Sequence, residues 1–227
     1  LALLVFLPYF LISFEKKNHM RALLGGLVLG TLNLVTYYCQ SKGLVSIPAS
    51  RSAFITGSST VMVPFLMPLF GLNKPLKIDF ICALLTLMGL FILTGANLNH
   101  LKTGDWWTLG CAVSVAFSII VIQRLSQYSQ KPFLLAFYQV LVTVPMSWVL
   151  VPEFPISVLS DKSVMQATIF CAVFATSLVF YLQMRYQQYT TAPRAAIIYS
   201  LEPLFATIFA VIINHDHLHL SVLFGGG

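Results

Sequence analysis

The feature that most constrains this chain is a succession of apolar runs, each about as long as a bilayer is thick. Seven complete runs cover residues 22–42, 50–72, 78–97, 106–126, 131–151, 163–184 and 193–213. A transmembrane helix needs about 20 predominantly apolar residues. The strands of an outer-membrane barrel would instead give segments of about 10 residues with alternating hydrophobicity. The runs therefore predict an all-α protein that crosses the bilayer several times.

Two shorter apolar segments lie outside these runs. Residues 1–14 are too few to span a bilayer and begin without Met, and residues 218–227 open another apolar segment. We therefore expect a sequence that is cut at both ends, with seven complete helices between two truncated ones.

The composition supports a membrane protein. Of the 227 residues, 58% are hydrophobic and 9% are charged, whereas soluble domains contain about 25% charged residues. The net charge of +6 comes from basic residues that occur singly or in pairs between the runs, so we expect no nucleic-acid partner. In alternate loops, nine Lys and Arg residues lie on one side, including Arg194, and four on the other, including Arg51. The side with nine is predicted to be cytoplasmic.

The run at 193–213 contains a carboxylate and a proline, in the sequence YSLEPLFA. A carboxylate at helix mid-depth costs roughly 2.5 to 3.5 kcal/mol on insertion scales, so Glu202 is expected to face a cavity or a partner. Pro203 has no N–H, which deprives the carbonyl of Tyr199 of its helical donor on the same helix face. Such backbone groups are tolerated at membrane depth where protein or water covers them. We therefore predict a binding site around Glu202.

An internal repeat appears when the chain is compared with itself at an offset of 143 residues. The matched pairs are Ala49 with Ala192, Arg51 with Arg194, Ala53 with Ala196, Tyr38 with Tyr181, Gln40 with Gln183 and Lys42 with Arg185. The chain crosses the membrane an odd number of times between the two copies, so the copies should point in opposite directions. This is the inverted-repeat plan of many secondary transporters.

Two segments carry a resemblance to a known family. IPASRSAFITG at 47–57 and TTAPRAAIIYSLEPLFA at 190–206 resemble the duplicated domain of EamA-type transporters of the drug/metabolite transporter superfamily. The resemblance implies ten helices in two inverted repeats: residues 1–97, lacking the first helix, and residues 106–227, with a truncated last helix. The copies differ chemically, because the first has Ser59-Thr60 where the second has Glu202-Pro203.

The resemblance also implies a function. It predicts a secondary-active transporter, most often an exporter, that moves small metabolites or drugs by alternating access through a central cavity and uses no cofactor. We expect it in the lipid bilayer of a bacterial inner membrane, with a small molecule as its substrate. The oligomeric state stays open, and a homodimer is one of the possible states. The alternative within the superfamily is a nucleotide-sugar or sugar-phosphate exchanger. A membrane-embedded enzyme or a sensor is the alternative of another class.

Polar residues at helical spacing outline the predicted cavity. Asn33, Tyr37 and Gln40 share one helix face, and at the repeat offset they become Thr176, Phe180 and Gln183. The next helix of each half adds Thr56 in the first copy, and Tyr199, Ser200 and Glu202 in the second. The alternative is that Ser, Thr, Asn and Gln here bond one membrane helix to another.

Arg51 and Arg194 lie near helix starts, where they would meet the interface or a neighbouring carbonyl, or contact a substrate anion. The sequence predicts no metal site, because His215, His217 and His219 alternate and no second shell can be identified. The four cysteines lie in apolar runs without CxxC spacing and are predicted to be free thiols. No catalytic constellation is present in the sequence, so an enzyme is not expected.

Two roles for Glu202 follow from its predicted depth. Burial disfavours a charged carboxylate, so Glu202 could take up a proton when the cavity is dry and release it when water or a cationic substrate enters. In this reading it is the coupling or substrate-cation group. In the other reading it is structural, a protonated acid bonded permanently to a carbonyl of the next helix.

Overall fold

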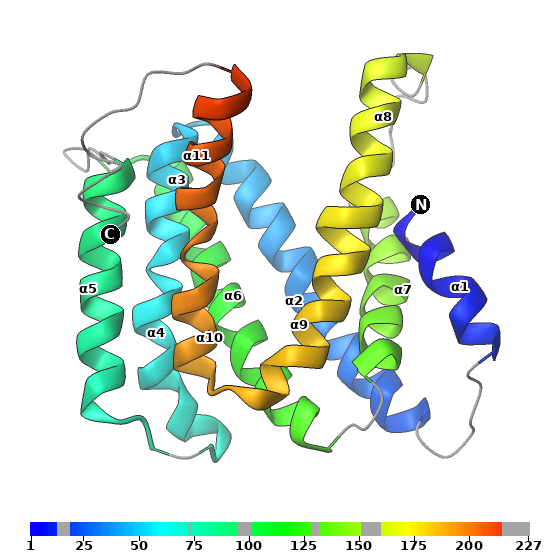
Figure 1. The fold of residues 1–227 in the computed structure, drawn as a ribbon, viewed down its shortest axis with the longest axis horizontal. Coiled ribbons are helices and arrows are strands. Elements are labelled where there is room, and N and C mark those ends of the chain that lie inside the picture. The colour runs from blue at the N-terminus through cyan, green and yellow to red at the C-terminus, as the bar shows by residue number, and fades with distance from the viewer. Residues whose placement is uncertain (13–18, 73, 95–100, 129–131, 151–159, 215–227) are drawn as a thin grey trace. The chain divides into compact units, whose positions relative to one another are not determined.

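The computed structural model describes residues 1–12, 19–72, 74–94, 101–128, 132–150 and 160–214. These residues form helices connected by short loops, and no strand occurs among them (Figure 1). The α-helices are α1 (Ala2–Ile12), α2 (His19–Leu44), α3 (Ala49–Gly57), α4 (Ser59–Leu66), α5 (Lys77–Thr94), α6 (Thr103–Tyr128), α7 (Pro132–Leu150), α8 (Lys162–Phe170), α9 (Val179–Tyr186), α10 (Ala192–Tyr199) and α11 (Glu202–Asn214). Three short segments of other helical type are η2 (Met67–Phe70), η4 (Cys171–Leu178) and η5 (Gln187–Tyr189).

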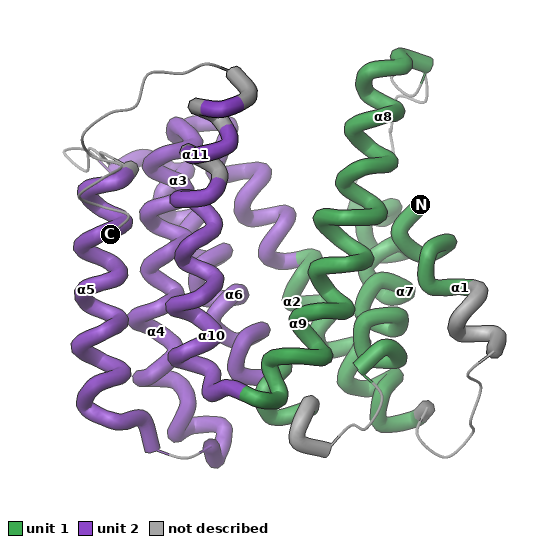
Figure 2. The backbone as a smooth tube through the Cα atoms, viewed as in Figure 1, with its two compact units in different colours: residues 1–34, 122–189 green, residues 35–121, 190–227 purple. Residues whose placement is uncertain are grey.

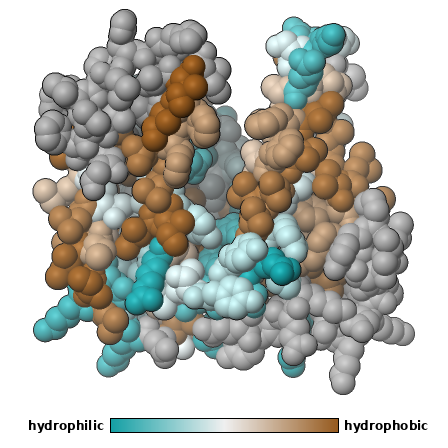
Figure 3. All heavy atoms as spheres, viewed as in Figure 1, coloured by the Kyte–Doolittle hydropathy of each residue, from teal (hydrophilic) through white to brown (hydrophobic). Residues whose placement is uncertain are grey.

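The all-α membrane fold is confirmed. Five helical segments of the described chain are long and apolar enough to cross a membrane: Met20–Leu44, Ala49–Phe70, Thr103–Leu125, Pro132–Leu150 and Lys162–Tyr189. The remaining two predicted runs are also helical, as α5 and as α10 with α11. In Figure 3, hydrophobic residues cover the middle of α8 and hydrophilic residues gather at its first turn. The segment from Leu218 onward lies outside the described residues.

The chain divides into two compact units (Figure 2). Unit 1 consists of residues 1–34 and 122–189, and unit 2 of residues 35–121 and 190–227. Each unit therefore takes segments from both predicted repeats, and α2 and α6 contribute to both units. A compact unit and a sequence repeat are different divisions of the chain, so the repeat boundaries stay a prediction.

Unit 1 is held together by close helix packing between α2 and α7. A Cβ atom on Gly26 would collide with the Cβ of Tyr138, and one on Gly30 would lie 2.8 Å from the carbonyl oxygen of Gln139. Thr143 Oγ1 donates a hydrogen bond of 3.3 Å to the Gly30 carbonyl. Glycines allow this approach because membrane helices associate through backbone proximity and interhelical hydrogen bonds.

A π-helical segment, η4, interrupts the span that runs from α8 to α9 in unit 1. Ser177 Oγ donates to the carbonyl of Ala172, five residues back, at 2.7 Å. The stretch of α2 at the repeat offset, residues 28–35, is regular α-helix. The two related helices therefore differ in backbone geometry at the place where Thr176 and Asn33 lie. Short π segments inside α-helices occur frequently at functional sites.

Unit 2 brings the two repeat copies into contact. Figure 1 shows α3–α4 and α10–α11 running in opposite directions, and α4 packs against α10. The core between them and α6 contains Val63, Met67, Ala116, Ile119, Ile120, Ala192, Ala195 and Ala196. The small alanines of α10 let the two helices approach closely.

Candidate substrate and coupling site

Both repeat copies contain a helix break at the same place. α3 ends at Gly57 and α4 begins at Ser59; α10 ends at Tyr199 and α11 begins at Glu202. At the offset of 143 residues, the start of α3 falls on the start of α10, and Ser59 falls on Glu202. The symmetry seen in the sequence is therefore present in the helix geometry, except that the second break is one residue longer.

At each break, a serine side chain donates a hydrogen bond to the carbonyl three residues earlier. Ser58 has φ −61° and ψ −16°, and Ser200 has φ −68° and ψ −7°. The Oγ of Ser58 donates to the carbonyl of Ile55 and that of Ser200 to the carbonyl of Ile197, both at 2.6 Å. Such bonds from serine to the preceding turn compete with helical hydrogen bonds and bend helices. In the second copy Pro203 adds to the break, since it has no N–H to donate.

Glu202 is the first residue of α11, and its side chain is exposed. A carboxylate in the first turn of a helix interacts favourably with the helix dipole. Tyr37 of α2, whose side chain is 46% exposed, lies within electrostatic range of the Glu202 carboxylate. Both residues belong to unit 2. Two predicted site residues from distant parts of the chain therefore lie in the same unit, within electrostatic range of each other.

The equivalent positions in the first copy are closed. Ser59 and Thr60 are buried at 5% and 2% exposure. Thr56 is half-buried, and its Oγ1 lies 3.9 Å from Cys111 Sγ on α6 in a weak hydrogen bond. Thr56 therefore bonds one helix to another, which was the alternative reading of the polar residues in this helix.

The other predicted cavity residues fall in two groups. Tyr37, Gln40, Thr56, Tyr199, Ser200 and Glu202 lie in unit 2, and Asn33, Thr176, Phe180 and Gln183 lie in unit 1. On α2, the Nδ2 of Asn33 and the Oγ1 of Thr36 are buried and have no hydrogen-bond partner among the described residues. The convergence of all ten residues on one cavity stays a prediction.

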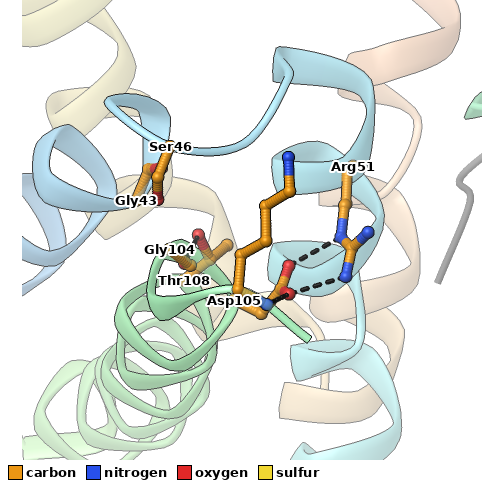
Figure 4. A network of polar contacts seen from close by, with 7 residues as sticks. Gly43, Ser46, Arg51, Gly104, Asp105 and Thr108 are labelled. Atoms are coloured by element: carbon orange, nitrogen blue, oxygen red, sulfur yellow. Dashed lines mark hydrogen bonds and ion pairs between the residues drawn. The ribbon is translucent and has the colours of Figure 1, made fainter. Parts of the chain in front are cut away.

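Arg51 forms an ion pair with Asp105, a residue that was not among the predicted site residues. Its Nε lies 2.7 Å from Asp105 Oδ1 and its Nη2 lies 2.6 Å from Asp105 Oδ2, in a bidentate ion pair (Figure 4). The two residues are 7% and 5% exposed. One signal could have found Asp105: it opens the run at 106–126 on the same predicted side of the membrane as Arg51. An anion contact by Arg51 stays a prediction, and such an anion would have to compete with Asp105.

Arg194, the equivalent of Arg51 in the second copy, has a different environment. It lies in the first turn of α10 with an exposed side chain. Within the part of the chain that the structure describes, no hydrogen bond or ion pair involves its guanidinium.

The described residues contain no candidate metal site. No group of three or more potential metal-ligating side chains occurs among the described residues. The three alternating histidines lie outside them. Cys39, Cys82, Cys111 and Cys171 are free thiols, as predicted.

The long apolar helices and the helical fold define a polytopic α-helical integral membrane protein. The model of the EamA-like transporter family matches residues 1–95 and 102–227. The chain belongs to this family, and it is therefore a membrane transporter of the drug/metabolite transporter superfamily.

Two similar proteins extend the comparison. An uncharacterized transporter of Archaeoglobus fulgidus is 30% identical over 229 residues, which cover 99% of this chain and 70% of that protein. A solved structure, titled only as the crystal structure of a protein, has a TM-score of 0.70 at 13% identity, covering 99% of this chain and 89% of the other. At this identity the likeness concerns the fold alone.

Proposed function

We propose that this transporter is a secondary-active carrier that exports small metabolites or drugs by alternating access between inverted repeats. Glu202 is its coupling or substrate-cation group, and Tyr37 is the partner of Glu202. The observation that carries the proposal is the break between α10 and α11, after which the exposed Glu202 carboxylate begins α11. Discontinuous helices commonly form the substrate and ion sites of secondary transporters.

The chemistry of the pair suits this role. A carboxylate can bind a proton or an organic cation, and a tyrosine offers a hydroxyl to the carboxylate and a ring face to a cation. Both side chains are exposed, and the proposal requires that they face water rather than lipid. The structural alternative requires a hydrogen bond from Glu202 to a carbonyl, and the described residues contain none.

A second candidate is the nucleotide-sugar or sugar-phosphate exchanger. The exposed guanidinium of Arg194 favours it, because arginine binds phosphate through paired N–H groups. The ion pair of Arg51 argues against an equal role for the two arginines. As part of the proposal we place the protein in the bacterial inner membrane.

Flux measurements can separate these candidates. Full-length protein reconstituted in sealed vesicles is given a panel of cationic, neutral and phosphorylated metabolites, with and without an imposed pH gradient. The carrier proposal expects flux of a cationic or neutral solute that the pH gradient accelerates. Exchange that requires a phosphorylated solute on both sides would instead establish the exchanger. Chemical conversion of a solute without flux would contradict both.

A further inference from the structure

We propose that Arg51 and Asp105 are positioning residues that hold Tyr37 and Glu202 in register with each other. The proposal rests on the function proposed above, because it concerns the geometry of the same pair. In this proposal Arg51 and Asp105 act on that geometry indirectly. Their effect passes through the helices of unit 2 that they join.

On one side, Asp105 fixes the start of α6. Its Oδ2 also accepts a hydrogen bond of 2.6 Å from the backbone N–H of Lys102, so the carboxylate is held at the first turn of the helix (Figure 4). A carboxylate that bonds backbone N–H groups there also interacts favourably with the helix dipole. Asp105 therefore moves together with the start of α6.

The helix α6 packs tightly on the part of α2 that carries Tyr37. A Cβ atom on Gly43 would collide with Thr108 Oγ1, and one on Gly104 would lie 2.6 Å from the Gly43 carbonyl oxygen. Near Tyr37, Tyr38 and Trp107 contact each other edge to face, with ring centroids 5.9 Å apart. Since glycine contacts leave no space between the helices, movement of α6 displaces α2 and Tyr37 with it.

On the other side, Arg51 belongs to the first turn of α3, which continues through Ser58 into α4. The helix α4 packs on α10 through Val63, Ala192, Ala195 and Ala196. The helix α10 leads through the second break directly to Glu202. Movement of α3 along its axis is therefore passed to α10 and to Glu202.

The ion pair connects these two sets of helices. The planar fork of a guanidinium matches a carboxylate in only a few orientations, whereas an apolar contact has no such directional requirement. A buried bidentate pair thus sets the axial register and rotation of α3 against α6. A lysine at position 51 would keep the charge and lose that geometry.

The test measures a distance in unit 2 that does not depend on transport. Spin labels are placed on Val35→Cys in α2 and Phe205→Cys in α11, both exposed, in full-length protein without its native cysteines. In Arg51→Lys we expect the distance distribution between the labels to broaden and its mean to shift. The matched control is Arg194→Lys, at the equivalent arginine, which has no ion-pair partner among the described residues; it should leave the distribution unchanged.

A second measurement connects the distance to function. In Arg51→Lys the midpoint of the pH profile of flux should move toward that of Tyr37→Phe, an effect that loss of stability alone does not produce. If Arg51→Lys does not fold, the charge swap Arg51→Asp with Asp105→Arg should fold. The spin-label distance distribution of this double variant should differ from that of the protein with Arg51 and Asp105 in place. An unchanged distribution in a folded Arg51→Lys or charge-swap protein would overturn the positioning role.

The positioning role and the proposed function fail separately. If Glu202→Gln and Tyr37→Phe both leave the pH profile unchanged, the proposed function is wrong. The spin-label distances still decide whether Arg51 and Asp105 set the register of α2 against α11.

Discussion

The two copies of the broken helix, α3–α4 and α10–α11, share their backbone and differ in their chemistry. Each starts at the same repeat position, breaks at the same place and is bridged by a serine bonded three residues back. The first copy buries its charged and polar groups, in the Arg51–Asp105 pair and at Ser59 and Thr60. The second exposes Arg194 and Glu202. In unit 2, the polar groups of α3–α4 therefore resemble structural contacts, whereas those of α10–α11 are available to a ligand.

This difference shows what the repeated sequence does and does not determine. The small residues shared by the two copies, and a serine next to each break, set where a helix starts and breaks, because these depend on local sterics and hydrogen bonds. The environment of a charged residue depends on which other helix lies beside it. Equivalent positions in a duplicated protein therefore need not have equivalent roles.

The largest expected effect separates the two arginines. Arg51→Ala leaves the Asp105 carboxylate buried without its cation, so unfolding in detergent should become easier by about 3 to 5 kcal/mol. Arg194→Ala removes an exposed side chain that has no ion-pair partner in the described part of the chain, and should change the free energy of unfolding by less than about 0.5 kcal/mol. Thermal unfolding of both purified variants measures the difference. Equal destabilisation by the two substitutions would contradict the contrast between the copies.

The two helix breaks should also tolerate substitution differently. A Cβ atom on Gly57 would collide with Leu90 of α5, so Gly57→Val should destabilise the protein by about 1 to 3 kcal/mol through overpacking. At the equivalent position of the second copy, Ser200→Ala removes one hydrogen bond to the Ile197 carbonyl, which is worth about 0.5 to 1.5 kcal/mol. Unfolding of the two variants in the same detergent tests this order. A larger loss for Ser200→Ala would show that the second break is the more tightly packed.

The smallest expected change is in accessibility, not in stability. In a cysteine-free background, Glu202→Cys and Tyr37→Cys should react with a small polar thiol reagent, because both side chains are exposed. Ser59→Cys and Thr60→Cys should react much more slowly, since both positions are buried. Labelling followed by mass spectrometry gives the rates. Protection of positions 37 and 202 would remove the solvent access that the proposed function requires.

Much of the fold could be predicted because bilayer thickness imposes run lengths that are visible in the sequence. The starts of α3 and α10 followed from the repeat, whereas the importance of the segment around Glu202 stays a prediction. The partner of Arg51 was not predicted. The place of Asp105 in the sequence indicates only the side of the membrane, whereas the pairing depends on how α3 packs beside α6. The π geometry of η4 also has no sequence signal, because its residues are as apolar as the regular helix at the repeat offset. The stripe Asn33, Tyr37 and Gln40 was predicted as one face, yet the boundary between the compact units falls within it.

The central claim is that Glu202 couples transport, and Glu202→Gln tests it most directly. Glutamine keeps the shape of the side chain and a hydrogen-bond donor, but it cannot ionise. Flux of a transported solute is measured against pH in sealed vesicles, with wild-type and variant protein present in equal amounts. If Glu202 couples transport, the variant inserts normally and its flux no longer depends on pH, or it loses cationic solutes selectively. Normal flux with an unchanged pH dependence in a well-expressed Glu202→Gln protein would contradict the claim.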